Sequence, residues 1–321
     1  MDGRNGRVGV MLRRDLPREQ VIPFTRGAEE LGFDELWIVE DLGFRGGIAQ
    51  AATALASTSS ITVGIGLLPA GARNAAFAAM ELATLAELFP GRLVAGVGHG
   101  MPGWMRSVGA WPASPMTLLE EYIVAVRTLL RGGRLETGDA RYVTVDDVAL
   151  ETVARPPVVP AVLAGVRGPR SLALSGRVAD GTILAEPAGP EYVRASLAHI
   201  APTRPHAMVS YNIGAVDPDA TVAIDAARPG LAWIGEADWS VHIDPLPFAA
   251  ELSALRADCG SREEFAARLP AEWVARLAIA GTAADVRARN EELFAAGVTT
   301  SVLTPVGDDA FSALESLATA L

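Results

Sequence analysis

Short continuous apolar runs alternate along the chain with longer segments of helical periodicity, and residues 61–100 show both. Residues 61–68 are apolar or β-branched at nearly every position, as in a strand buried on both faces. In residues 75–89 the apolar side chains recur at three- and four-residue steps, which is typical of a helix. Another apolar run follows at residues 93–97. This pattern predicts two parallel strands joined by a crossover helix, so the glycine-containing loops after both strands open at the same edge of a sheet.

The same alternation extends over the whole chain. Apolar runs predict eight strands, at residues 8–12, 36–39, 61–68, 93–97, 158–164, 181–184, 206–216 and 299–303. Segments of helical periodicity separate most of them. Two stretches interrupt the alternation and are interpreted as insertions. Residues 134–157 contain short strand-like runs, and residues 217–280 have a mostly helical pattern broken by prolines.

A single domain spanning residues 1–321 is expected, because neither a linker nor a shift in composition divides the chain. The regular alternation of strand and helix favours an α/β fold, specifically an eight-fold (β/α)8 TIM barrel. An open doubly wound sheet is the alternative. The barrel is preferred because glycine-rich loops follow many of the predicted strands, whereas an open sheet would place such loops at one crossover.

The composition argues against several classes of function. A net charge of −11 disfavours non-specific binding to nucleic acid or to an anionic membrane. The chain contains no lysine, which excludes Schiff-base chemistry on lysine and a P-loop. Cys259 is the single cysteine, so neither an intramolecular disulfide nor a thiolate cluster is expected. No spacing of potential ligands suits a metal, and no apolar run resembles a signal or a membrane span. A cytoplasmic protein without a metal is therefore expected.

Polar side chains follow three of the predicted strands. Glu40 and Asp41 come directly after the second strand and are the acids best placed to face a ligand, with a helix cap or loop anchor as the competing interpretation. His99 follows the fourth strand beside Gly98, and a glycine lets the backbone approach a ligand closely. A lone histidine is more often a hydrogen-bonded structural residue. Glu186 lies just past the sixth strand and is a further candidate.

A third glycine loop opens the helix after the fifth predicted strand. Its candidate residues are Gly165, Val166, Arg167, Gly168, Arg170 and Ser171. Free backbone N–H groups at a helix start, together with arginine, form a site for a phosphate group. The alternative is an ordinary β-to-α turn with solvated arginines, and spacing alone leaves both interpretations open.

Four runs along the chain resemble a known family. They are GIGLLP at residues 64–69, PGRLVAGVGHG at 90–100, VPAVLAGVRGPR at 159–170 and AGTAADV at 280–286. Together they resemble the bacterial luciferase-like oxidoreductases. The nearest branch is the one that uses the deazaflavin coenzyme F420, which includes methylenetetrahydromethanopterin reductase. The resemblance covers most of the chain in the right order.

The resemblance implies a flavin-type ring lying over the carboxyl ends of the barrel strands. It also implies a bulge after the third strand that presses on the ring from behind, often with a cis peptide bond that does not precede proline. The bulge corresponds here to Gly66, Leu67 and Leu68, and we predict a cis bond between Gly66 and Leu67. The resemblance further favours the third glycine loop as the cofactor-phosphate site. Beside the cofactor it places Gly98, His99 and Glu186.

Two departures from the family pattern bear on the substrate. The F420-dependent enzymes often carry an Asp-His pair after the second strand, where this chain has Asp41 followed by Leu42. The family's sugar-phosphate dehydrogenases carry a glutamate after the glycines of the fourth strand, where this chain has Met101. Both departures argue against a sugar-phosphate or alcohol dehydrogenase. Trp104, further along that loop, is a candidate for the wall of the substrate pocket.

The resemblance implies an oxidoreductase that transfers hydride between coenzyme F420 and a small organic substrate, with His99, Glu40 and Asp41 as acid–base candidates. The first alternative is an FMN-dependent monooxygenase supplied by a separate flavin reductase. The second is a non-catalytic flavin-binding protein, because the family's histidine and glutamate are missing. The family commonly forms dimers through its barrel helices, so a homodimer is expected.

Overall fold

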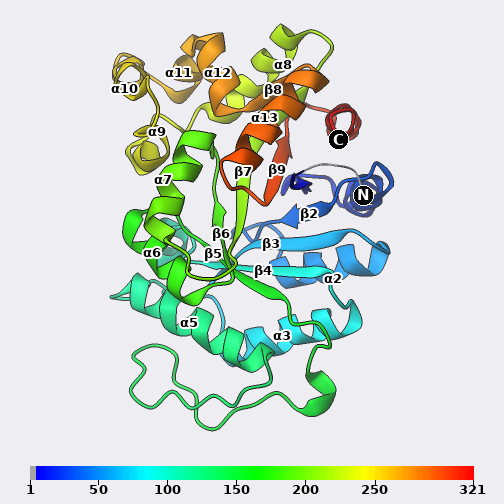
Figure 1. Cartoon of the computed structure of the whole chain (residues 1–321), viewed down its shortest axis with the longest axis vertical. Coiled ribbons are helices and arrows are strands. Elements are labelled where there is room, and N and C mark those ends of the chain that lie inside the picture. Colours follow the sequence, from blue (N-terminus) through cyan, green and yellow to red (C-terminus); the bar gives the residue numbers. More distant parts are fainter. Residues whose placement is uncertain (1–4) are drawn as a thin grey trace.

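Eight parallel strands close into a barrel surrounded by helices in the computed structural model, which describes residues 5–321 (Figure 1). The strands of these residues are β1 Arg7–Met11, β2 Glu35–Ile38, β3 Thr62–Pro69, β4 Leu93–Gly98, β5 Ala161–Gly165, β6 Gly181–Leu184, β7 Ala207–Val216, β8 Ile279–Gly281 and β9 Thr300–Pro305. The α-helices are α1 Arg18–Glu30, α2 Gly47–Ser57, α3 Ala75–Leu88, α4 Pro102–Ser107, α5 Pro115–Leu130, α6 Pro169–Val178, α7 Pro190–Ile200, α8 Ala220–Ala227, α9 Ser240–Ile243, α10 Ala249–Ala257, α11 Arg262–Arg268, α12 Ala271–Leu277, α13 Ala283–Ala295 and α14 Ala310–Ala318. Short 3-10 helices are η1 Thr152–Ala154, η2 Arg228–Leu231 and η3 Ala237–Trp239.

The strand order confirms the (β/α)8 barrel. Neighbouring strands follow the order β6-β5-β4-β3-β2-β1-β9-β7, and β7 returns to pair with β6. Every one of these pairings is parallel. The carboxyl ends of the strands therefore gather at one mouth, which is where barrels of this type carry their sites. β8 lies outside the closed set and pairs with residues 214–216 at the end of β7.

Several local features differ from the sequence predictions. β8 starts at the end of residues 217–280, and its three residues are too few to stand out as an apolar run. β5 begins at Ala161, three residues later than predicted, because Pro160 has no backbone N–H to donate to a neighbouring strand. The loop after β4 contains the short helix α4, which carries Trp104. Residues 142–145 do not form a strand.

Aromatic rings fill the barrel interior beneath its mouth. Trp37 of β2 is fully buried and meets Tyr211 of β7 edge to face, with 5.6 Å between the ring centroids. Two glycines of β3 make room for these rings. A Cβ atom at Gly64 would lie 2.4 Å from the Trp37 ring, and one at Gly66 would lie 1.7 Å from the Tyr211 hydroxyl oxygen. Packing of the interior therefore requires glycine at both positions.

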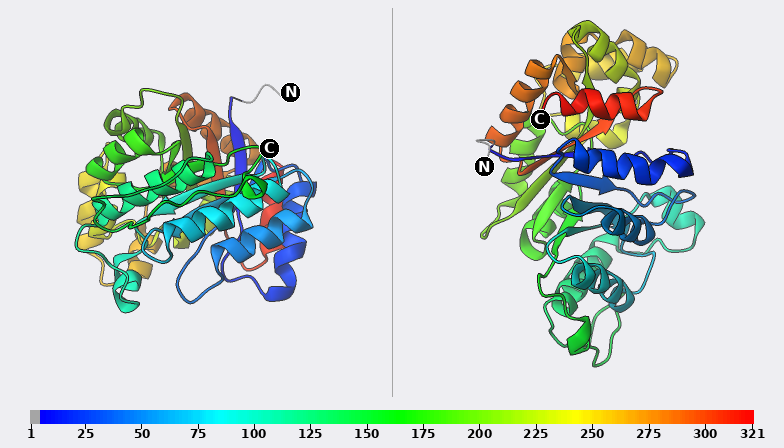
Figure 2. Two further views of the ribbon diagram at one scale, coloured as in Figure 1. Left: turned by 90° about the horizontal axis from the view of Figure 1, so that it is seen from below. Right: turned by 90° about the vertical axis from the view of Figure 1, so that its right-hand side faces the viewer.

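The two insertions lie at opposite ends of the molecule (Figure 1, Figure 2). Residues 134–157 run beneath α3 and α5 in Figure 1, and the Glu121 carboxylate of α5 accepts hydrogen bonds from the backbone N–H groups of residues 141–143. Residues 217–280 carry helices α8 to α12. Their apolar side chains form a hydrophobic cluster around Phe265 that also includes Ile213 and Ala215 of β7. The second insertion is therefore a small helical unit whose core is completed by the end of a barrel strand.

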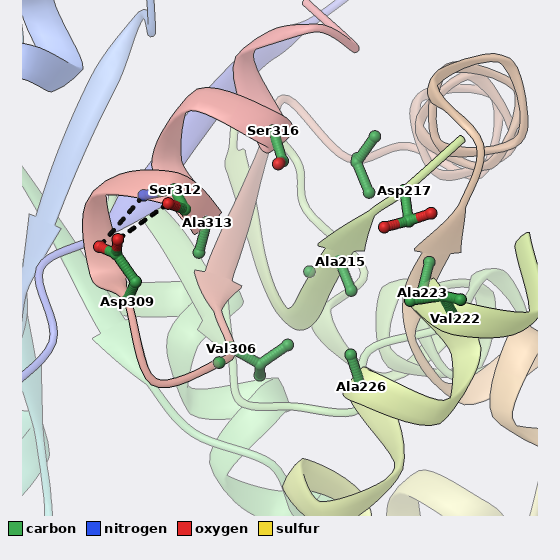
Figure 3. Close-up of a pocket in the computed structure, with 13 residues that line it drawn as sticks. Ala215, Asp217, Val222, Ala223, Ala226, Val306, Asp309, Ser312, Ala313 and Ser316 are labelled. Atoms are coloured by element: carbon green, nitrogen blue, oxygen red, sulfur yellow. Dashed lines mark hydrogen bonds between the residues drawn. The ribbon is translucent and has the colours of Figure 1, made fainter. Parts of the chain in front are cut away.

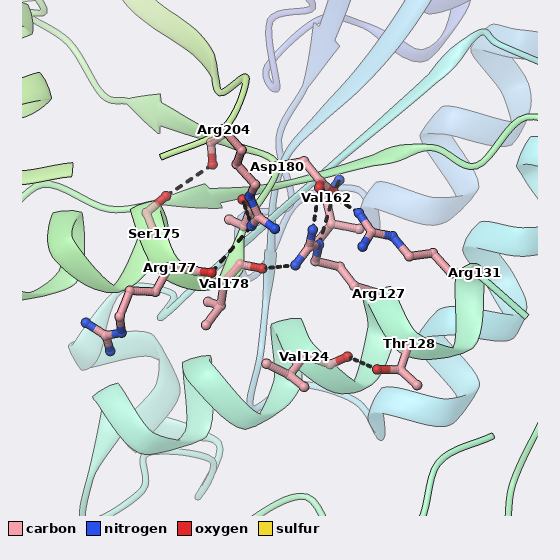
Figure 4. A network of polar contacts seen from close by, with 12 residues as sticks. Val124, Arg127, Thr128, Arg131, Val162, Ser175, Arg177, Val178, Asp180 and Arg204 are labelled. Carbon is pink, nitrogen blue, oxygen red and sulfur yellow. Dashed lines mark hydrogen bonds and ion pairs between the residues drawn. The ribbon is translucent and has the colours of Figure 1, made fainter. Parts of the chain in front are cut away.

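An arginine–aspartate network joins the helix layer to the amino ends of β5 and β6 (Figure 4). Asp180, directly before β6, accepts hydrogen bonds from Arg127 and Arg131 of α5 and, at 3.1 Å, from the backbone N–H of Val162. Burial raises the pKa of Asp180, but the hydrogen bonds from Arg127 and Val162 outweigh burial and lower the pKa overall. The network lies at the end of the barrel away from the mouth, so Asp180 has a structural role.

Among residues 5–321, no helix has both the length and the hydropathy needed to cross a lipid bilayer. The same residues contain no group of three or more His, Cys, Asp and Glu side chains arranged to hold a metal ion. Cys259 is a free thiol buried in the hydrophobic cluster of the second insertion.

Candidate functional site

β3 ends in a bulge at the mouth of the barrel. Its pairing with β4 shifts register between Ile65 and Leu68. The peptide bond between Gly66 and Leu67 is cis, which confirms the sequence prediction. The bulge turns the Leu67 side chain toward the ends of the two following strands.

The Leu67 side chain covers the ends of β4 and β5. A Cβ atom at Gly98 would lie 2.5 Å from Leu67 Cδ2, and one at Gly165 would lie 2.2 Å from the same atom. A Cβ atom at Gly98 would also lie 2.9 Å from the Gly165 carbonyl oxygen, so a backbone contact restricts position 98, whereas at Gly165 the atoms nearest to a Cβ atom all belong to the Leu67 side chain. The first, second and third glycine loops meet here, as their common position at the strand ends predicts.

The Glu40 carboxylate accepts hydrogen bonds from other groups of the protein. Its Oε2 atom accepts a hydrogen bond of 2.7 Å from the backbone N–H of Gly47, the first residue of α2. Both carboxylate oxygens lie 2.8 Å from Nη2 of Arg73. The Glu40 side chain is 13% exposed. This geometry favours the loop anchor over the acid–base group among the two interpretations of Glu40.

Asp41 differs from its neighbour Glu40 in its surroundings. Its carboxylate forms an ion pair with Arg14 from the loop after β1, and the Arg14 guanidinium lies 4.7 Å from the centroid of the Phe44 ring. The Asp41 side chain is 22% exposed. Asp41 is therefore held in place by one partner and remains reachable from solvent.

His99 is partly buried at the end of β4. Burial lowers the pKa of its imidazole, and a hydrogen bond to the backbone carbonyl of Pro115 opposes this with a smaller effect. The neutral ring thus donates one N–H to the start of α5. No other hydrogen bond reaches the His99 ring within residues 5–321, so its second ring nitrogen is available to a ligand.

Helix α6 begins without a side-chain cap. Gly168 precedes Pro169, and the backbone N–H groups of Arg170 and Ser171 make no hydrogen bond within the described chain. Ser171 Oγ donates instead to the Gly168 carbonyl at 2.9 Å. The first turn contains no acid, and Arg170 is exposed. The free N–H groups and the positive end of the helix dipole suit an anionic group such as a phosphate.

Arg167 in the same loop contacts the second insertion. Its Nη1 atom donates to the Asp238 carbonyl at 3.3 Å, and its guanidinium carbon lies 4.9 Å from the centroid of the Trp239 ring. The Arg167 carbonyl accepts a 3.0 Å hydrogen bond from the Tyr192 hydroxyl. Val166 is buried and donates its N–H to a carbonyl of β6. Arg167 and Val166 therefore anchor the loop to its surroundings. The backbone N–H groups of Arg170 and Ser171, at the start of α6, stay accessible to a ligand.

Glu186 lies two residues past β6, on the opposite side of the mouth from Asp41. Its side chain is partly buried. Burial is the largest influence on Glu186 and raises its pKa, and the Asp41 carboxylate raises it further, while Arg167 and Arg14 oppose both with smaller effects. The carboxyl groups of Asp41 and Glu186 therefore interact electrostatically across the mouth.

Four residues around the mouth have no role assigned to them from the sequence pattern: Arg73, Tyr211, Trp239 and His242. Arg73 follows the end of β3, and its pairing with Glu40 joins residues far apart in the chain. Tyr211 lies within an apolar strand, where nothing marks its hydroxyl. Trp239 and His242 belong to the second insertion, whose position over the loops after β5 and β6 only the structure reveals.

The described part of the chain also forms two surface hollows. The first, of about 240 Å³, is enclosed by α8, α14 and the end of β7, where Asp309 caps α14 through Ser312 (Figure 3). The second, of about 350 Å³, lies beside α3 and α5 and is lined by Arg73, Trp111 and Tyr122 among others. No candidate residue from the sequence lines either hollow.

The sequence profile of luciferase-like monooxygenases matches residues 6–300 of this chain. The chain belongs to the luciferase-like monooxygenase family. This membership confirms the resemblance found in the glycine-rich runs after β3, β4 and β5.

Individual luciferase-like relatives extend over nearly the full chain. The 5,10-methylenetetrahydromethanopterin reductase of Methanolobus tindarius is 28% identical over 320 residues, which cover 93% of this chain and 94% of the relative. The coenzyme F420-dependent tetrahydromethanopterin reductase of Methanopyrus kandleri superposes with a TM-score of 0.81 at 22% identity, over 98% of this chain and 97% of that chain. An F420-dependent secondary alcohol dehydrogenase superposes with a TM-score of 0.77 at 18% identity, over 98% of both chains. The two superpositions establish the shared fold.

Proposed function

We propose that this luciferase-like protein is an F420-dependent oxidoreductase that exchanges hydride with a small organic substrate. The observation that carries the proposal is the alignment with the Methanolobus reductase over nearly the whole of both chains. The F420-dependent enzymes that share the fold add support.

The mouth of the barrel fits a deazaflavin that carries a phosphate group. The uncapped first turn of α6 offers the N–H groups of Arg170 and Ser171 to the phosphate, with the exposed Arg170 side chain beside them. The bulge at Gly66, Leu67 and Leu68 would help to hold the ring. When bound, the cofactor supplies or accepts the hydride, and the protein orients it and excludes water.

Asp41 and His99 are the residues from the sequence prediction that keep acid–base capacity toward a ligand. Asp41 is partly exposed beside Arg14, and one nitrogen of the His99 ring has no partner in the described part of the chain. Glu40 serves the site differently, because its carboxylate joins the start of α2 to Arg73. Glu40 is therefore a positioning residue in this proposal.

An FMN-dependent monooxygenase is the second candidate, and the description of the family favours it. Such an enzyme would need a flavin reductase as a partner. Both cofactors carry a phosphate group, so the open start of α6 accommodates either one. A non-catalytic flavin-binding protein is a third candidate, consistent with Leu42 and Met101 in place of the family's histidine and glutamate.

Titration of the purified protein with F420 and with FMN, followed by quenching of cofactor fluorescence, separates these candidates. We expect micromolar binding of F420 and much weaker binding of FMN. Micromolar binding of FMN without binding of F420 would replace the first candidate by the second. Tight binding of F420 whose redox state no substrate ever changes would favour the non-catalytic protein.

We also propose that residues 1–321 work as one domain, and that the protein acts as a homodimer in the cytoplasm. Support for the dimer comes from α3, on which Phe77 and Leu88 are 64% and 60% exposed and Met80 is also exposed. Sedimentation equilibrium tests the dimer, and Phe77→Glu should yield monomers if α3 lies in the interface. Cell fractionation tests the location.

A further inference from the structure

The second insertion holds the backbone at Glu186 in place. The Glu186 carbonyl oxygen accepts a hydrogen bond of 3.1 Å from Trp239 Nε1. The next carbonyl, that of Pro187, lies 3.2 Å from His242 Nδ1. Burial lowers the pKa of His242 to about 4, so its neutral ring donates Nδ1–H to that carbonyl. Two side chains of the insertion therefore act on consecutive residues of the loop after β6.

The barrel holds the same loop from the other side. Asn212 of β7 accepts a 2.9 Å hydrogen bond from the Ala188 N–H and donates at 3.4 Å to the Ala188 carbonyl. The Glu186 carboxylate itself stays free, since the hydrogen bond it accepts within the described chain comes from its own backbone N–H. A fixed backbone thus presents a partly exposed and unpaired carboxyl group at the mouth of the barrel.

Charged and titratable groups face Glu186 from every neighbouring loop and strand: Asp41, Arg14, Arg167, Tyr211 and His242. None of them forms an ion pair with Glu186. Asp41 is instead paired with Arg14. Two nearby carboxyl groups in such different environments take different roles, because the one without a cation partner retains its proton more readily.

We propose that Glu186 is the acid that protonates the heteroatom of a substrate with a C=O or C=N bond as hydride reaches its carbon. The inference rests on the proposed function, which supplies the two-electron donor, reduced F420. A C–H bond of the reduced deazaflavin breaks with both its electrons, so the donor is oxidised. The new C–H bond forms at the electrophilic carbon of the substrate, which is reduced, and the π-electron pair moves onto the oxygen or nitrogen. The O–H bond of Glu186 breaks, and its proton forms the new O–H or N–H bond. The Glu186 carboxylate then takes a proton from water.

Two probes that differ in their need for a proton test this role. Reduction of 4-nitrobenzaldehyde needs hydride on carbon and a proton on oxygen. The 1-benzyl-3-carbamoylpyridinium cation accepts hydride alone, because it already carries a positive charge. Full-length wild-type protein, Glu186→Gln and the control Glu136→Gln are loaded with reduced F420, and single-turnover oxidation is followed by absorbance. Glu136 is exposed in the first insertion, at the far end of the molecule.

We expect Glu186→Gln to slow reduction of the aldehyde at least about 100-fold while reduction of the pyridinium changes by less than about threefold. Glu136→Gln should change neither rate. The wild-type rate with the aldehyde should fall as pH rises through the raised pKa of Glu186, and Glu186→Gln should abolish that dependence. Equal slowing of both probes, an unchanged aldehyde rate, or wild-type protein that reduces the pyridinium but not the aldehyde would overturn the proposal.

Infrared spectroscopy gives an answer that does not depend on turnover. At a pH between the ordinary pKa of a glutamate and the raised pKa of Glu186, the F420-loaded wild-type protein should show a C=O stretch of a protonated carboxyl group that is lost in Glu186→Gln and kept in Glu136→Gln. A band unaffected by Glu186→Gln contradicts the proposal whether or not the probes react. Failure of the wild-type protein to bind F420 refutes the proposed function. If wild type and Glu186→Gln bind F420 equally, a difference between their aldehyde rates is due to the acid role of Glu186 and not to cofactor binding.

Discussion

The two sides of the barrel mouth treat their polar groups in opposite ways. On the side of β2 and β3, the carboxylate of Glu40 is satisfied by Arg73 and by the start of α2. On the side of β5 and β6, the N–H groups at the start of α6 and the carboxyl group of Glu186 have no such partners among residues 5–321. Both glutamates follow barrel strands at the same edge. This difference shows that position at a strand end does not define the role of an acid. A carboxyl group can act on a ligand only if the folded protein does not already occupy it with hydrogen bonds and ion pairs.

The largest effect on stability should come from removing the hydrogen-bonded carboxylate of Glu40. Glu40→Ala leaves Arg73 without its carboxylate partner and removes the acceptor for the Gly47 N–H. We expect the free energy of unfolding to fall by about 3 kcal/mol, measured by urea denaturation. Glu186→Gln is the matched variant and should change it by less than about 0.5 kcal/mol. Equal losses in both variants would remove the contrast between the two sides.

The open start of α6 should show its effect in ligand binding. Arg170→Ala removes a charged contact to the phosphate, so the Kd for F420 should rise about 30-fold, equivalent to about 2 kcal/mol. Fluorescence titration measures it. Arg177→Ala, at the other end of the same helix, is the control and should leave Kd within twofold. Unchanged affinity in Arg170→Ala would return this loop to an ordinary β-to-α turn.

A smaller effect is expected where the second insertion holds Glu186. Trp239→Phe keeps an aromatic ring and deletes the N–H that binds the Glu186 carbonyl, a loss of about 1 kcal/mol. The aldehyde rate should fall about fivefold at unchanged F420 affinity, and its pH dependence should shift. Trp233→Phe serves as the control, since Trp233 is half exposed. A fall in stability with normal kinetics would instead show a purely structural contact.

The smallest expected effect on stability concerns Glu29, whose carboxylate accepts hydrogen bonds from more backbone N–H groups than that of Glu40. Burial raises the pKa of Glu29, but the backbone N–H groups of Ile61, Ser60 and Ser59 lower it to about 2. A depressed pKa contributes stability that is present above the ordinary value of 4.5 and is lost as pH falls toward 2. Glu29→Gln should therefore cost about 1 kcal/mol at pH 7 and little at pH 2, measured by urea denaturation at both pH values. An equal cost at both would exclude the charge as the cause.

The barrel and the bulge could be predicted from the sequence, because both depend on local pattern. Buried strands read as continuous apolar runs, and the run GIGLLP identified the cis bond between Gly66 and Leu67 through family resemblance. Local pattern also indicated the open start of α6, where Gly168 and Pro169 supply no capping side chain. β8 escaped prediction because its three residues form too short a run.

The partners of the candidate residues could not be predicted, because tertiary contacts choose them. Glu40 meets Arg73 across 33 residues, and Trp239 meets Glu186 across 53. Both pairings depend on loops that converge only when the barrel closes. The glycine at position 98 was expected to let a ligand approach, whereas the structure shows that it also makes room for Leu67. A glycine in a sequence indicates that another group packs closely against the backbone at that position, but the sequence does not identify that group.

The separate hydrophobic cluster of residues 217–280 has a consequence for how this protein can evolve. Because most of that cluster belongs to the unit's own helices and only Ile213 and Ala215 of β7 come from a closed barrel strand, helix positions that do not touch β7 or the mouth can accumulate substitutions with little effect on the barrel. Exchange of this unit between paralogues would alter what enters the mouth, and it would preserve the cofactor loop where the contacts of Asp238 and Trp239 with Arg167 are kept. New specificities can therefore arise by recombination of a module.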